Sequence, residues 1–140
     1  MNCNNLPVTT MEHPEQKLQE KLRKFLASRL KPEIVWMASA NGGYRDPHTA
    51  VNLKAMGVLP GAPDLCFCLD NGKTGWIELK APGGKLSPVQ KGIAARLIRL
   101  NHFWGVAHSI KEAVDIMRPW SVFKDDADLN EPREIEETEA

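Results

Sequence analysis

The sequence predicts an α/β domain in which helices flank a mixed central β-sheet. Two apolar runs, residues 65–69 and 76–80, lie on either side of Asn71-Gly72, and this arrangement is a strong signal for a β-hairpin. Helical spacing of apolar residues precedes and follows this hairpin, and residues 103–108 form a further short apolar strand. Strands interleaved with helices in this order indicate a mixed sheet flanked by helices, which is α/β in class.

The N-terminal part of the chain is predicted to contain a long helix, a strand and a short helix. Pro14 suits the first turn of the long helix, and apolar residues continue from it at helical spacing to Leu30. Residues 34–38 are expected to form a strand. Pro47, preceded by an aspartate that can cap a helix, begins a short helix that Gly57 ends.

The C-terminal part is predicted to contain two helices separated by the strand at residues 103–108. Ser87 and the proline after it begin a helix that is expected to reach about Leu100. Its expected buried face contains Ile93, Leu97 and Leu100. A capping box opens a last helix over about residues 109–118.

Length and charge predict one folded domain followed by an acidic tail. A chain of 140 residues has the size of one domain, which we expect to occupy residues 12–120. We expect residues 1–11 and 121–140 to be disordered, because the last segment is poor in apolar residues. Residues 125–140 carry eight acidic residues and one basic residue, so their net charge is −7 and that of residues 1–124 is +7. A basic body suits a polyanionic partner, although a solvated surface explains the same charges.

Several classes of protein do not fit the composition. No apolar run approaches the roughly 20 residues of a membrane helix. Residues 1–30 lack the apolar segment of a secretory signal, and three cysteines do not make a disulfide framework. The four histidines show no spacing typical of zinc ligands. We therefore expect a protein of the reducing cytoplasm with no membrane partner.

The hairpin brings together side chains that can perform chemistry. Asp64 opens its first strand, and Glu78 and Lys80 share one face of the second because side chains two apart on a strand point the same way. Strand pairing can then place the carboxylate of Asp64 near that of Glu78. A carboxylate pair beside a lysine is a site for a hard divalent cation and an activated water. A simple turn into a strand and an amphipathic edge strand are the alternative interpretations.

Two residues outside the hairpin have both a structural and a catalytic interpretation. Glu15 falls at the upper end of the apolar stripe of the first helix, whereas Glu20 lies on the solvated face. An acidic residue in a first turn also stabilises the helix dipole without any further role. Gln90 is expected to point toward the sheet, but it also forms a capping-box pattern with Ser87.

Five blocks of the sequence, taken in order, resemble the VRR-NUC family of the PD-(D/E)xK nuclease superfamily. These blocks are Asn41-Gly42-Gly43, Lys54-Ala55-Met56-Gly57, Pro60-Gly61-Ala62-Pro63-Asp64-Leu65, Ile77-Glu78-Leu79-Lys80 and Gly83-Gly84-Lys85-Leu86-Ser87-Pro88-Val89-Gln90. A lone Pro-Asp with a later Glu-x-Lys is weak evidence, but five blocks in this order are specific. The resemblance covers about residues 12–117 and implies a restriction-endonuclease-like core.

The resemblance also implies a role for each residue of the central motif. Asp64 and Glu78 would bind Mg²⁺ or Mn²⁺, and the backbone carbonyl of Leu79 would add a third ligand. Lys80 would orient the attacking water or help to deprotonate it, and would offset charge on the phosphate.

Further residues of the site follow from the same resemblance. An acidic residue of the first helix completes such sites, and here Glu15 is the inward-facing candidate while Glu12 competes with it. Gln90 matches the glutamine of the helix that follows the core strands. The residues expected to contact DNA are Asn41, Arg45, Lys54 and Lys85.

The resemblance implies a structure-specific DNA endonuclease. Small stand-alone members of the family resemble phage or mobile-element enzymes, in particular homodimeric Holliday-junction resolvases. We therefore expect a homodimer that cuts branched DNA such as a four-way junction, in the host cytoplasm if the chain is phage-encoded. The alternatives are a general nickase or nuclease of phage DNA processing, and a catalytically silent DNA-binding module.

Overall fold

The order of elements is the one that the sequence predicts. The computed structural model describes residues 13–39 and 47–133. Its elements are α1 (Pro14–Ala27), β1 (Trp36–Ala38), α2 (Pro47–Ala55), β2 (Leu65–Cys68), β3 (Thr74–Leu79), α3 (Pro88–Arg99), β4 (Phe103–Ala107), α4 (Ile110–Met117) and the 3₁₀ turn η2 (Arg118–Trp120). Asn41 and Arg45 lie outside the described residues, as do Glu12 and the predicted disordered segment 1–11.

The four strands form a mixed sheet in the order β1-β2-β3-β4. The first three strands pair antiparallel, and β4 pairs parallel with β3. The parallel pair needs a crossover, which α3 supplies. The expected α/β class, a mixed sheet flanked by helices, is therefore confirmed.

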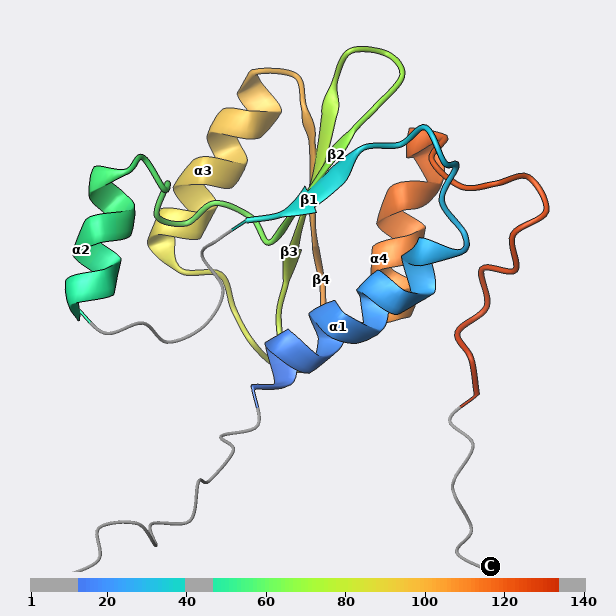
Figure 1. Ribbon diagram of the computed structural model, residues 1–140, viewed down its shortest axis with the longest axis horizontal. Helices are drawn as coiled ribbons and strands as arrows, with labels where there is room; N and C mark the ends of the chain where they lie inside the picture. The colour runs from blue at the N-terminus through green and yellow to red at the C-terminus, as the bar shows by residue number, and fades with distance from the viewer. Residues whose placement is uncertain (1–12, 40–46, 134–140) are drawn as a thin grey trace, which may run out of the picture.

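Helices cover both faces of this sheet, and Figure 1 shows α3 and α4 on opposite sides of β4. Strand alternation explains the division. Ile77 and Leu79 face a core that α1 and α4 cover, and both side chains are almost fully buried. Glu78, between them, faces α3 and accepts a hydrogen bond from Gln90. The strand that carries the predicted chemistry is thus buried on both faces, which holds its backbone firmly.

The packed domain extends beyond its predicted end at residue 120. Val122 is fully buried and Phe123 is 9% exposed, and Phe123 forms an isolated β-bridge with Leu30. The backbone N–H of Lys31 donates to the carbonyl of Val122 at 2.9 Å. The sequence prediction places residues 121–124 in the tail, together with a following segment that is poor in apolar residues. The burial of the Val122 and Phe123 side chains makes residues 121–124 part of the packed domain.

Three smaller differences concern the ends of elements. α1 ends at Ala27 rather than Leu30, because Leu30 joins the β-bridge. Leu100 was expected on the buried face of α3, but it follows the helix and is 68% exposed. β1 begins at Trp36 rather than residue 34. In the part of the chain that the structure describes, no helix has the length and apolar content needed to cross a membrane.

Candidate active site

The carboxylates of Asp64 and Glu78 lie side by side at the ends of β2 and β3. The strand register pairs Leu65 with Ile77, so Asp64 comes opposite Glu78 one position further along. The backbone N–H of Leu79 donates to Oδ2 of Asp64 at 2.7 Å. Glu78 is only 4% exposed, and it is the single buried charged residue among those described. A buried carboxylate with a second one beside it is a costly arrangement unless a cation or a proton compensates it.

A tight loop before β2 fixes the position of Asp64. Gly61 adopts φ +79°, and a Cβ there would come within 2.6 Å of a Val89 methyl carbon. Glycine is therefore required both by the left-handed backbone and by close packing on the first turn of α3. On the other side, the N–H of Ser39 donates to the carbonyl of Asp64 at 2.8 Å. The loop thus holds Asp64 between β1 and α3.

Gln90 makes both contacts that its sequence position suggests, one with Ser87 and one with Glu78. Its side-chain oxygen Oε1 accepts from the backbone N–H of Ser87 at 2.9 Å. The backbone N–H of Gln90 donates to the Ser87 hydroxyl at 3.2 Å, and the two bonds together form a capping box. The amide nitrogen of the same side chain donates to Oε1 of Glu78 at 2.9 Å. Gln90 therefore fixes one oxygen of Glu78 and leaves the other for a further partner.

The backbone carbonyl of Leu79 points to the side of β3 on which β2 lies. The N–H of Lys80 donates to the carbonyl of Ala107 on β4 at 3.0 Å. A trans peptide points its C=O and N–H in opposite directions, and none of the described peptides is cis, so the carbonyl of Leu79 points away from β4. Asp64 lies on that side. The three oxygens that the sequence suggested as ligands thus come from adjacent positions.

Burial and neighbouring charges shift the pKa values of both site carboxylates. Burial, followed by the charge of Asp64, raises the pKa of Glu78 from its ordinary 4.5 to about 8. Burial also raises the pKa of Asp64, although the Leu79 N–H opposes this. The charge of Glu15 raises both pKa values and that of Lys80 lowers both. Glu15 and Lys80 are therefore close enough to both carboxylates for their charges to act on them.

This coupling separates Glu15 from the other acidic residues of α1. Glu20 does not contribute to the pKa of either site carboxylate, and its side chain accepts from Gln16 at 3.2 Å. Both glutamates are exposed, but Glu15 occupies the first turn, where α1 approaches the site. The competition between Glu15 and Glu12 stays open because Glu12 lies outside the described residues.

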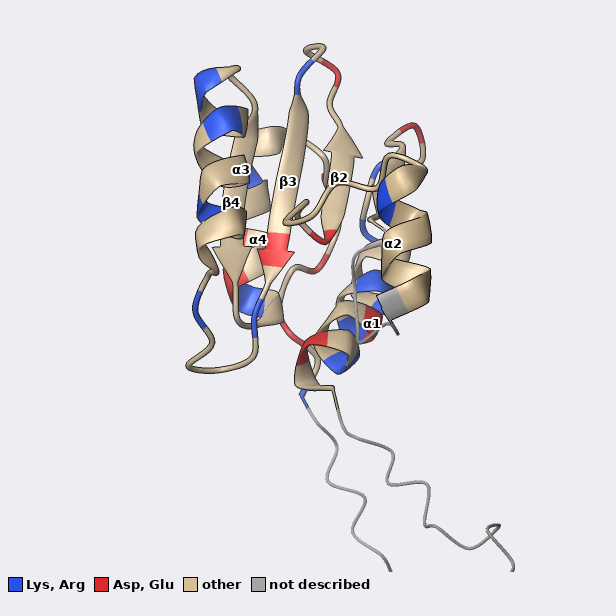
Figure 2. Cartoon of the chain, turned by 90° about the vertical axis from the view of Figure 1, so that its left-hand side faces the viewer, with Lys and Arg blue, Asp and Glu red and all other residues tan. Residues whose placement is uncertain are grey.

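The two described residues that were expected to contact DNA are both exposed. Lys54 lies in the last turn of α2, and Lys85 follows a turn in which Gly83 adopts φ +77°. Figure 2 shows further Lys and Arg positions along α3, which are Lys91, Arg96 and Arg99. The crossover places α3 antiparallel to β3 and β4, so its C-terminal arginines lie at the end of the sheet opposite Asp64.

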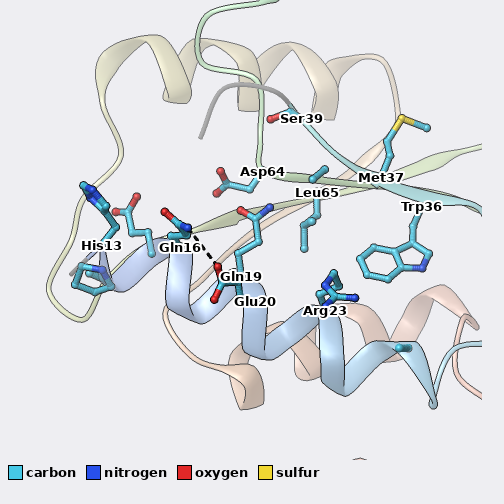
Figure 3. A pocket seen from close by; sticks show the side chains of 15 residues that line it. His13, Gln16, Gln19, Glu20, Arg23, Trp36, Met37, Ser39, Asp64 and Leu65 are labelled. Carbon is cyan, nitrogen blue, oxygen red and sulfur yellow. Dashed lines mark hydrogen bonds between the residues drawn. The ribbon is translucent and has the colours of Figure 1, made fainter. Parts of the chain in front are cut away.

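Sequence reasoning missed two features near the site. The His108 ring forms hydrogen bonds with the carbonyl of Gly84 at 3.2 Å and with Glu112 at 3.0 Å, so it ties the turn before Lys85 to α4. The second feature is a cleft of about 730 Å³ that α1 and β1 enclose and that opens on Asp64 (Figure 3). A cleft between two elements leaves no local pattern. Only the polar positions 16, 19, 20 and 23, spaced along one face of α1, hint at it.

The oxygen-rich donor set fits a hard divalent cation. Within residues 13–39 and 47–133, no three His, Cys, Asp or Glu side chains converge closely enough to hold a metal. Two carboxylates and a backbone carbonyl nevertheless provide the ligand type that Mg²⁺ and Mn²⁺ prefer, and Mg²⁺ keeps several waters in such sites. A cation there would also balance the paired charges of Asp64 and Glu78.

Comparison with known proteins agrees with this fold. The VRR-NUC domain model matches residues 14–111. A solved structure of a VRR_NUC domain protein has the same fold, with a TM-score of 0.57 and 20% identity over 77% of this chain and 88% of that chain. No curated protein matches the chain. The fold and the family match define a nuclease-type protein. The chain belongs to the VRR-NUC domain family, as its five motif blocks suggested.

Proposed function

We propose that the chain is an endodeoxyribonuclease that uses Mg²⁺ or Mn²⁺ and cuts branched DNA, in the manner of a Holliday-junction resolvase. The observation that carries the proposal is the paired carboxylates of Asp64 and Glu78. Gln90 and the Leu79 N–H each bind one carboxylate oxygen, which directs the remaining oxygens to a common partner. A silent binding module would gain nothing from two acidic groups facing a phosphate.

The site residues have distinct parts in the reaction. Asp64, Glu78 and the carbonyl of Leu79 would hold the cation, which when bound polarises the phosphate and lowers the pKa of a coordinated water. Gln90 orients Glu78 so that one oxygen faces the cation site. Lys80 extends from the end of β3 on the same face as Glu78, where its charge stabilises the negative charge that develops on the phosphate.

The basic surface suggests how DNA approaches this site. Lys85 lies near the start of α3, and Lys91, Arg96 and Arg99 continue along a helix of about 18 Å. Phosphates held along α3 would extend from the cation site toward the far end of the sheet. This arrangement supports a duplex arm lying on α3, with the cut at the end where Asp64 lies.

We also propose that two copies act together, since a junction has two strands to cut. Exposed large apolar side chains on α2, on the loop that follows it and at the end of α3 support this. The residues are Val51, Met56, Leu59, Ile98 and Leu100. Light scattering of the purified chain measures its mass directly, and a strictly monomeric chain at micromolar concentration would contradict this part of the proposal.

Cleavage of a matched panel of four-way junction, flap, splayed and linear DNAs tests the proposal, with Mg²⁺, Mn²⁺ or excess EDTA. Asp64→Asn and Glu78→Gln should each slow cleavage by at least about 10³-fold, since cation-assisted charge stabilisation is worth several kcal/mol. DNA binding should be unchanged or tighter, because each change removes a charge that repels phosphate. Asp70→Asn, in the exposed turn at the opposite end of the hairpin, is the matched control.

The panel also separates the alternatives. Cleavage of linear and branched DNA at equal rates would indicate a general nuclease. Binding without cleavage under any cation would indicate a silent module. Cleavage by Asp64→Asn at the wild-type rate would mean that the cation site is elsewhere.

A further inference from the structure

The cleft between α1 and β1 continues the active site away from the cation position. Figure 3 shows residues of α1 along one side and residues of β1 along the other, with Leu65 between Asp64 and Trp36. Trp36 pairs with Phe67, which comes three residues after Asp64 in the chain. The backbone positions of Trp36 and Asp64 are therefore about 10 Å apart along the strand direction. A volume of about 730 Å³ is within the usual range of small-ligand sites. A group held there would lie close to the scissile phosphate.

The charges of the cleft exclude the phosphate backbone as its main occupant. Among the described residues, its lining includes the carboxylates of Glu15, Glu20 and Asp64, one guanidinium, that of Arg23, and the imidazole of His13. Such a lining repels a run of phosphates, which the basic residues of α3 attract instead. With a cation balancing Asp64, the carboxylates of Glu15 and Glu20 still outnumber Arg23, so the lining favours a neutral part of the substrate.

The remaining groups of the cleft suit a planar heterocycle. Trp36 is half-buried, and its ring stacks on Phe67 with centroids 5.6 Å apart and planes at 3°. This contact holds the indole rigidly at the cleft wall, where an aromatic group can stack a base. Gln19 lines the same cleft with both a donor and an acceptor. Ser39 adds a buried hydroxyl with no hydrogen-bond partner among the described residues.

We propose that this cleft binds an unpaired nucleobase of the DNA, within a few nucleotides of the phosphate to be cut. The inference rests on the proposed nuclease function, and it assigns that function a specificity. Bases in a continuous duplex stay paired and stacked, whereas bases at a branch can leave the stack at less cost. The cleft would therefore favour branched over linear DNA, with Trp36 as a specificity-determining residue rather than a catalytic one.

The test uses the full chain in EDTA, so that DNA is bound but not cut. A splayed duplex carries 2-aminopurine at an unpaired position next to the branch, and a linear duplex carries it at a paired position. Binding should quench the fluorescence of the splayed probe only. Trp36→Ala should weaken binding of the splayed DNA by roughly tenfold, and of the linear duplex by less than about twofold. Trp36→Phe, which keeps an aromatic ring against Phe67, should retain most of the quenching.

Two matched controls separate base binding from a general folding effect. Trp104→Ala removes a half-buried tryptophan from β4, the opposite edge strand, and should not change the preference for splayed DNA. Met37→Ala removes a residue that lines the cleft, and Val35→Ala removes an exposed neighbour that does not. Of these two changes, Met37→Ala should reduce quenching and Val35→Ala should not. Melting curves should show that each variant is folded.

Unchanged fluorescence on saturating binding of wild type would overturn the proposal. Equal losses on splayed and linear DNA in Trp36→Ala would also overturn it. The proposed nuclease function fails separately, by an absence of cation-dependent cleavage. Cleavage without quenching therefore rejects the base-binding cleft alone, and quenching without cleavage rejects the nuclease alone.

Discussion

Strand β3 and helix α1 both carry groups of the site, but they hold them in different ways. β3 pairs with a strand on each side, and Glu78 on it is buried and bonded to Gln90. The first turn of α1 is exposed, and so is the side chain of Glu15. The strand thus fixes its groups before substrate arrives, whereas the helix leaves its carboxylate free to adjust.

This difference has a consequence for the sizes of mutational effects. Groups held rigidly at the position where charge develops contribute most to a transition state. An exposed side chain must lose conformational entropy before it contributes, so its net effect is smaller. Changes on β3 should accordingly slow the reaction more than equivalent changes on α1.

After the two carboxylate changes described above, the largest effect is expected for Lys80→Ala. Removal of a positioned proton donor or acceptor typically costs about 10²–10⁴-fold in rate. Single-turnover rates should fall within this range while the dissociation constant for DNA changes only severalfold. Lys91→Ala, on the exposed part of α3, should instead weaken binding and leave the single-turnover rate unchanged. If Lys80→Ala alters only binding, Lys80 is a phosphate contact.

A smaller effect is expected for Glu15→Gln. Loss of a group that supports a metal site without holding it rigidly costs about 10–100-fold in activity. Glu20→Gln, one and a half turns further along α1, should stay within about twofold of wild type, because Glu20 is not coupled to Asp64 or Glu78. Cation titrations of both variants measure this. Wild-type activity in Glu15→Gln would leave Glu12 as the candidate.

The buried position of Glu78 should also make the cation-free protein sensitive to pH. Its pKa of about 8 in the folded chain exceeds the ordinary 4.5, so the folded state holds more protons between these values. The free energy of unfolding should then fall as pH rises from about 5 to 8. The melting temperature should fall with it, by roughly 3–6 °C per pH unit. Glu78→Gln should flatten this slope. Glu33→Gln, an exposed control, should not.

The smallest effect is expected from the acidic end of the chain. The carbonyl of Asp128 accepts from Arg29 at 2.6 Å, and Leu129 packs against the core, so truncation after Arg133 is safer than truncation after Lys124. Removing residues 134–140 deletes four carboxylates. If the tail competes with DNA, affinity should rise roughly two- to fivefold at low salt and converge with wild type at high salt. Equal affinities at low salt would leave a role in solubility.

The sequence predicted the strands and the carboxylate pair because each depends on short-range patterns. The turn Asn71-Gly72 and the period-two alternation around Glu78 determine the hairpin and its faces without reference to the rest of the chain. The motif blocks then supplied the family. The sequence allows Gln90 either a capping contact or a contact with the sheet, and the structure shows that one side chain makes both contacts.

What the sequence could not predict depends on contacts between distant segments. Val122 and Phe123 pack beside Leu30, and no local pattern links residues so far apart. Because the segment that follows them is acidic, their burial could not be predicted from the local sequence. The cleft at Trp36 is similar, because it exists only where α1 lies across β1. An exposed stripe of polar residues on a helix usually faces bulk solvent, so its position beside a cleft had to come from the structure.

The two contacts of the Gln90 amide restrict which residue can stand at position 90. Its oxygen must accept from Ser87 while its nitrogen donates to Glu78. A glutamate there offers only acceptors and a lysine only donors, and asparagine is shorter by one methylene. Moreover, a helix that docked one residue out of register would keep the contact with Ser87, which caps the same helix, but would lose the contact with Glu78. The hydrogen bond from the Gln90 amide to Glu78 thus forms only when α3 is correctly aligned on the sheet, and the same bond orients the Glu78 carboxylate.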